Sequence, residues 1–124
     1  MSTIAIATIF IPKTYGPNDL VLIDDILTKW CDEVKGTKKG RFWETVKDNS
    51  VFTVDVRPTE SKLLDYEDEL LELDLLPEDV PETISIVSNN LSSDRDSNYY
   101  FVKLLADEIV NKLDGISNGA RYRS

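Results

Sequence analysis

A run near the N-terminus, Ile4–Ile11, constrains the fold more than any other part of the chain. It is almost continuously apolar, it is rich in β-branched side chains, and it stops at Pro12. β-Branched residues favour strands, and a strand without polar alternation is typical of one that is covered on both faces of a sheet. The run therefore predicts an interior strand with neighbours on both sides.

An amphipathic helix is predicted after the turn at 15–18, because apolar residues then recur at three- and four-residue steps until Gly36. The stripe consists of Leu20, Ile23, Ile26, Leu27, Trp30, Cys31 and Val34. We expect Leu27 and Trp30 to lie in the core and the Cys31 thiol to be packed rather than reactive.

The rest of the chain supplies more strands and another apolar helix. The segments are a hairpin at 42–46 and 51–56, a strand at 83–88, a last helix and an edge strand at 116–122. The last helix opens at Asp96 or Ser97, has an apolar stripe from Tyr99 to Leu113 and stops at Gly115. With the acidic helix introduced next, the order is β-α-β-β-α-β-α-(β). We predict a single α+β domain over 1–124, in which about three helices pack chiefly on one face of a mostly antiparallel sheet.

The net charge of −9 comes from one stretch of the sequence. Residues 60–82 hold ten carboxylates and a single base, Lys62, whereas acids and bases cancel in the rest of the chain. Helical spacing of Leu63, Tyr66 and Leu70 marks the buried side of a helix, with Leu64 and Leu71 adjacent and carboxylates opposite. The candidate partner-binding residues are therefore Asp65, Asp68, Glu69, Glu72, Glu78 and Asp79.

A concentrated field of one sign attracts partners of the opposite sign and speeds their encounter. The expected partner is a basic protein surface or a cation, and nucleic acid should be repelled. The competing interpretation is a solvated acidic helix that only maintains solubility, which is a common role for charge runs. The basic loop Lys35–Arg41 lacks the spacing of a phosphate-binding loop and is interpreted as solvated, with nucleic-acid contact as the alternative.

The composition argues against catalysis and against metal binding. The chain has no histidine, which removes the commonest general base, nucleophile activator and metal ligand. A zinc site would have to be built from carboxylates and one thiol. The common catalytic, nucleotide-binding and calcium-loop motifs do not occur in the sequence. We therefore predict a binding protein rather than an enzyme, with no cofactor and no metal.

The sequence also favours a cytoplasmic protein without a membrane partner. No apolar run approaches the ~20 residues that a membrane span needs, and the N-terminus lacks the pattern of a secretory signal. The single cysteine cannot form an internal disulfide, which fits a reducing compartment. The oligomeric state stays open.

The C-terminal third resembles small bacterial immunity proteins, the antidotes of polymorphic toxins and of contact-dependent growth-inhibition toxins. The matching residues are Leu76-Pro77, Ile84-Ser85-Ile86, Asp96 to Tyr100, Leu104 to Ile109 and Asp114-Gly115-Ile116. The resemblance implies a protein that binds and neutralises a cognate toxin, often a basic nuclease, and that carries no shared catalytic residues.

Two further classes of function remain open at this stage. One is an acidic nucleic-acid mimic, such as a phage anti-defence protein that occupies a DNA-binding protein. The other is a structural or assembly subunit.

Overall fold

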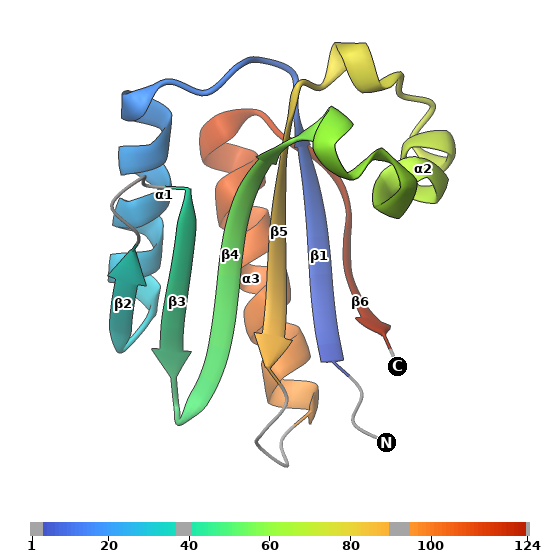
Figure 1. The fold of residues 1–124 in the computed structure, drawn as a ribbon. Coiled ribbons are helices and arrows are strands. Elements are labelled where there is room, and N and C mark those ends of the chain that lie inside the picture. The colour runs from blue at the N-terminus through green and yellow to red at the C-terminus, as the bar shows by residue number, and fades with distance from the viewer. Residues whose placement is uncertain (1–3, 37–40, 90–94, 124) are drawn as a thin grey trace.

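The computed structural model describes residues 4–36, 41–89 and 95–123. Its centre is a six-stranded antiparallel sheet in the order β2-β3-β4-β5-β1-β6 (Figure 1). The strands are β1 (Ile4–Ile11), β2 (Glu33–Gly36), β3 (Phe42–Lys47), β4 (Ser50–Pro58), β5 (Glu82–Asn89) and β6 (Ile116–Arg123). The helices are α1 (Pro17–Trp30), α2 (Leu63–Glu72) and α3 (Arg95–Leu113), with 3-10 turns at Thr59–Lys62 and Pro77–Asp79. The predicted α+β class is confirmed.

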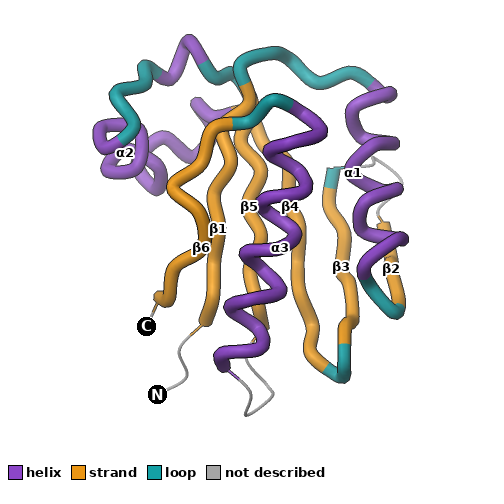
Figure 2. The backbone as a smooth tube through the Cα atoms, turned by 180° about the vertical axis from the view of Figure 1, so that it is seen from behind, coloured by secondary structure: helices purple, strands orange, loops and turns teal. Residues whose placement is uncertain are grey.

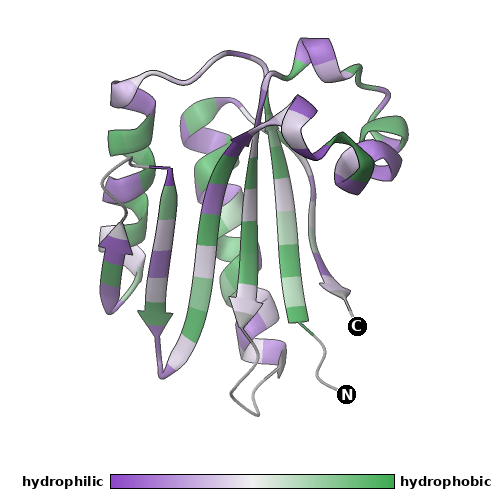
Figure 3. Ribbon diagram, in the orientation of Figure 1, coloured by the Kyte–Doolittle hydropathy of each residue, from purple (hydrophilic) through white to green (hydrophobic). Residues whose placement is uncertain are grey.

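Strand β1 occupies the interior position that its sequence predicted. It pairs with β5 on one side and with β6 on the other, and residues 5–11 are all buried. Ala5, Ala7, Ile9 and Ile11 belong to the main core, whereas Phe10 packs into a smaller cluster on the opposite face. Apolar residues dominate β1, whereas β3 contains both apolar and polar residues (Figure 3) and its exposed and buried positions alternate over 42–45. Burial on both faces explains why β1 shows little alternation.

Two of the helices cover one face of the sheet and build the main core (Figure 2). Their buried apolar residues are Ile23, Ile26 and Leu27 of α1, and Val102, Leu105, Ala106, Ile109 and Leu113 of α3. Helix α2 lies apart from them, near one corner of the sheet beside β1 and β6 (Figures 1 and 2). The expectation that the helices pack chiefly on one face therefore holds for α1 and α3.

The first helix is shorter than its apolar stripe predicted. It ends at Trp30, because Cys31 adopts an extended conformation with φ −102° and ψ 152°. Glu33–Gly36 then forms the edge strand β2, which pairs with β3 and which the sequence did not predict. Leu27 is fully buried as expected, whereas Trp30 is only partly buried at the border of the core.

The predicted hairpin is confirmed as β3 and β4, with a tight turn between them. Asp48 and Asn49 have φ values of 51° and 68°. Two successive left-handed residues match the twist of the flanking strands, and aspartate and asparagine tolerate that conformation. Residues 37–40 of the basic loop lie outside the described part of the chain, while Arg41 forms an ion pair with Glu82 at 2.7 Å.

Candidate functional site

The acidic charge lies on an excursion from the sheet, residues 59–81, that we call the acidic arm. The arm joins β4 to β5 and contains α2 between the two 3-10 turns. Its ends meet, because Pro58 pairs with Glu82 across the strands and the Thr59 N–H donates to the Pro81 carbonyl at 3.0 Å. Figure 1 shows the arm at the upper corner of the sheet, beside β1. The arm therefore leaves and rejoins the sheet at one point.

A small apolar cluster holds α2 against the face of the sheet that α1 and α3 leave uncovered. Phe10, Tyr66, Leu70 and Val80 form it, and the rings of Phe10 and Tyr66 meet edge to face with centroids 6.0 Å apart. The Tyr66 hydroxyl lies 3.3 Å from the Ser85 hydroxyl. Burial raises the pKa of the Tyr66 phenol above its ordinary value, which keeps it protonated and available for this hydrogen bond at neutral pH.

The prediction that Glu69 faces solvent is wrong. Glu69 is 5% exposed and forms an ion pair with Arg121 of β6, and its Oε1 accepts a hydrogen bond from the Thr8 hydroxyl at 3.4 Å. Burying a carboxylate is costly unless a cation and hydrogen bonds compensate it. Arg121 and Thr8 provide that compensation, so α2 turns Glu69 toward the sheet.

This orientation exposes two leucines to solvent, although the sequence analysis had placed them beside the buried stripe. Leu64 is 89% exposed and Leu71 is 72% exposed. At 100° per residue, the buried side centred on Tyr66, Glu69 and Leu70 lies opposite them. Sequence reasoning missed these two residues. The available signal was their seven-residue spacing, which places them on one line along a helix.

Most of the acidic charge is exposed. Glu69 and Glu82 are buried and paired with arginines. The eight other carboxylates of residues 60–82 are exposed, namely Glu60, Asp65, Glu67, Asp68, Glu72, Asp74, Glu78 and Asp79. The segment's one base, Lys62, lies 3.9 Å from Asp65. The arm therefore presents a strongly negative surface to solvent.

The structure groups the candidate residues in two places. Asp65, Asp68 and Glu72 follow one another at three- and four-residue steps on α2, and all three are exposed. The Asn118 side chain of β6 donates to Glu72 at 2.8 Å. Glu78 and Asp79 are exposed on the separate turn Pro77–Asp79. Five of the six predicted residues are thus accessible to a partner.

A cavity of about 230 Å³ lies beneath α2, and its charged residues are compensated within the chain. Arg57, Lys62 and Arg121 line it, and each forms an ion pair with a carboxylate that also lines it, Asp55, Asp65 and Glu69 respectively. The Asp55 pair lies within β4 and the Asp65 pair within the arm, whereas the pair between Glu69 and Arg121 joins the arm to β6. The pair between Glu69 and Arg121 therefore helps to hold the arm against the sheet.

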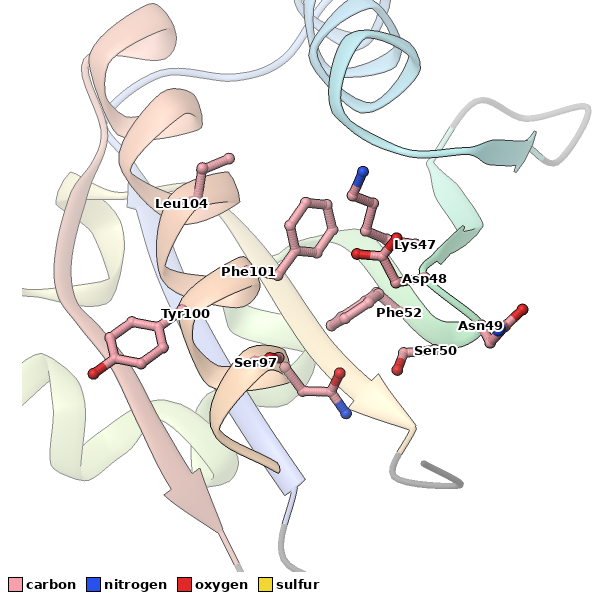
Figure 4. Close-up of a pocket in the computed structure, with 10 residues that line it drawn as sticks. Lys47, Asp48, Asn49, Ser50, Phe52, Ser97, Tyr100, Phe101 and Leu104 are labelled. Atoms are coloured by element: carbon pink, nitrogen blue, oxygen red, sulfur yellow. The ribbon is translucent and has the colours of Figure 1, made fainter. Parts of the chain in front are cut away.

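A second cavity, of about 630 Å³, lies between the β3–β4 turn and α3 (Figure 4). Phe52 and Phe101 form its apolar wall with ring centroids 4.9 Å apart, and Lys47 and Asp48 supply one charge of each sign at the turn. Tyr100 extends to the other side of α3 in Figure 4 and is largely exposed. The site is largely apolar and carries little net charge, unlike the acidic arm.

Two further observations concern the described residues only. Within residues 4–36, 41–89 and 95–123, no three side chains of the His, Cys, Asp or Glu type are grouped closely enough to hold a metal ion. No helix in this part of the chain combines the length and apolar character needed to cross a membrane.

Comparison with known proteins gives no match to a family model, to a curated protein or to a solved structure.

Proposed function

We propose that this protein is an immunity protein that binds a cognate bacterial toxin and keeps it inactive. The expected toxin has a basic surface of the kind that nucleases use to hold nucleic acid. The resemblance of the C-terminal third to immunity proteins agrees with this proposal, and the acidic arm supports it independently.

The observation that carries the proposal is the concentration of exposed charge on one projecting element. Eight exposed carboxylates belong to residues 60–82, whereas the charges of the rest of the chain cancel. Such a field raises the rate at which a cationic surface is encountered and favours one orientation of approach. A solubility function needs no such concentration, because dispersed charge also keeps a protein soluble.

In this proposal the protein acts by occupancy and has no turnover of its own. It binds in the cytoplasm, where its single thiol stays reduced, and it uses neither a cofactor nor a metal. Nucleic acid competes with it for the toxin and is not its ligand. Inhibition is therefore expected to saturate at a fixed ratio of the two proteins.

The test uses the toxin encoded beside the gene for this protein, produced together with it and then separated. Reversing Asp68 and Glu72 to lysine should slow association several-fold and flatten its dependence on salt, because rim charges act mainly through the association rate. The matched control is Asp25→Lys with Glu33→Lys, which changes the net charge equally on α1 and β2. The control should bind and protect like the parent.

Three outcomes contradict the proposal. The adjacent gene product could show no complex with the protein, or inhibition could proceed with many turnovers per molecule. If the variant with Asp68→Lys and Glu72→Lys kept the affinity and the salt dependence of the parent, the acidic face would not contact the partner. If instead the protein binds a DNA-binding protein of a defence system, the nucleic-acid mimic replaces the immunity function.

A further inference from the structure

We propose that the exposed side of α2 docks a basic amphipathic helix of the partner, with Leu64 and Leu71 as its apolar anchors. This inference rests on the proposed function, since both assign the acidic arm to a cationic protein. It adds that the partner is recognised through a helix. It also distinguishes the leucines, which hold the bound partner, from the carboxylates, which attract it.

The first observation is the position of the two leucines. They are 89% and 72% exposed and lie seven residues apart, opposite the buried side that is centred on Tyr66, Glu69 and Leu70. Two helical turns separate them, about 10 Å along the axis. Scattered exposed leucines are ordinary, but two in line at the outermost part of a projecting helix form a ridge.

The second observation is the set of carboxylates around that ridge. Glu67 lies on one flank and Asp68 on the other, close to the line between the leucines, and all four side chains are exposed. Glu72 lies further round on the Asp68 side. A partner that covers Leu64 and Leu71 must therefore bring cations to both flanks, or leave these carboxylates desolvated without compensation.

A helix fits this pattern better than a flat surface. Ridges of side chains on one helix pack into the grooves of another, and a seven-residue repeat keeps the contact in register along both. Leu64 and Leu71 occupy the same heptad position, and Asp68 lies where a partner lysine or arginine can reach it across the seam. The matching element is a helix with an apolar stripe bordered by Lys and Arg.

A second copy of this chain is the less suitable occupant. Two acidic arms brought together would place up to eight exposed carboxylates of one copy against those of the other. Like charges on adjacent helices repel, and the single base of the arm, Lys62, already lies 3.9 Å from Asp65 of the same arm. Charge complementarity thus selects a cationic helix.

The test measures binding of the full-length protein to a synthetic helix of about three heptads, with leucines on one line and lysines on both flanks. A peptide of the same composition in scrambled order is the comparison. We expect the patterned peptide to bind at least about tenfold more tightly, and Leu64→Gln with Leu71→Gln to remove that advantage, since burying leucine side chains is worth that much. Leu64→Met with Leu71→Met should retain it.

The matched control is Val21→Gln with Leu22→Gln on α1, where the parent residues are 56% and 41% exposed. Peptide affinity in this control should equal that of the parent. The inference is wrong if the glutamine variant of α2 keeps the parental preference for the patterned peptide, if both glutamine variants lose it equally, or if the protein dimerises through α2.

The outcomes also separate this inference from the proposed function. If charge reversal at Asp68 and Glu72 weakens toxin binding while the α2 leucine variant binds toxin normally, the acidic face meets the toxin and the helix-docking inference fails. If neither variant changes toxin binding, both fail. Circular dichroism of the methionine and glutamine variants identifies any loss of α2 itself.

Discussion

The two tryptophans of the chain lie in different surroundings. Trp43 is 2% exposed and packs in the main core, and its indole N–H donates to Asp24 Oδ1 at 3.0 Å. Trp30 is partly buried at the border of that core, and among the described residues its indole nitrogen has no hydrogen-bond partner. Asp24 is itself exposed, so the Trp43–Asp24 bond joins β3 to α1 at the edge of the core.

Asp24→Ala removes the acceptor of the Trp43 indole and should lower the free energy of unfolding by about 1–3 kcal/mol, because a buried donor then loses its partner. Asp25→Ala is the control, since Asp25 is exposed on the same helix like Asp24 but does not accept the Trp43 hydrogen bond. It should stay within about 0.5 kcal/mol of the parent. Urea denaturation of the two variants measures the difference, and equal stabilities would show that the bond contributes little.

At the residue scale, the sequence predicts whether a side chain is buried where local periodicity alone decides it. The stripe of α3 and the alternation of β4 each allow one buried side, and that side is buried in the structure. Glu69 was not predictable in this way, because the residue that decides its orientation, Arg121, lies 52 positions away. The four leucines of α2 allow two overlapping apolar sides, and partners distant in the sequence, Arg121 and Phe10 among them, contact the side that is buried.

At the scale of elements, α2 differs from the other helices in how it is held. A small apolar cluster around Tyr66 and Leu70 packs it against the sheet. The ion pair between Glu69 and Arg121 and a few side-chain hydrogen bonds to β1, β5 and β6 add to this contact. An element with few apolar contacts can open without unfolding the rest. The same reliance on distant partners explains why β2 was not predicted, since Val34 continues the helical stripe and only pairing with β3 defines the strand.

Arg121→Met should therefore loosen α2 locally. We expect its amides to exchange with solvent several-fold faster, equivalent to about 1 kcal/mol, because the arginine is half exposed and its contribution is screened. Amides of β1 and α3 should keep their protection. Lys103→Met, which removes an exposed ion pair with Asp107 on α3, is the control and should change little.

Hydrogen-exchange NMR resolves these regions separately. A uniform rise in exchange throughout the sheet would mean that α2 belongs to the global unfolding unit, contrary to this expectation.

At the scale of the whole molecule, charge and fold are separated in space. The sheet with α1 and α3 contains the main core, and the acidic arm adds eight exposed carboxylates at one corner. Carboxylates such as Asp68 and Glu72, four residues apart on a helix, repel each other by a few tenths of a kcal/mol. The arm is therefore a source of electrostatic strain that salt relieves.

Raising NaCl from low to physiological concentration should increase the stability of the parent protein by about 0.5–1 kcal/mol, because salt screens repulsion within the arm. The reversal Asp68→Lys with Glu72→Lys should show a smaller increase. The reversal Asp25→Lys with Glu33→Lys has the same net charge, so it should behave like the parent if the repulsion is local. Urea midpoints at the two salt concentrations measure these increases in stability. Equal increases in both reversals would instead indicate an effect of net charge.

The closed base of the acidic arm has a consequence for how such a protein can change over generations. Because Pro58 and Glu82 are cross-strand neighbours, β4 and β5 are already paired at the point where the arm begins and ends. Closing a longer or shorter loop changes the entropy only slowly with length. Insertions, deletions and substitutions in 59–81 can then accumulate while the sheet stays intact. A lineage could thus acquire new specificities by rewriting one segment of an inherited scaffold.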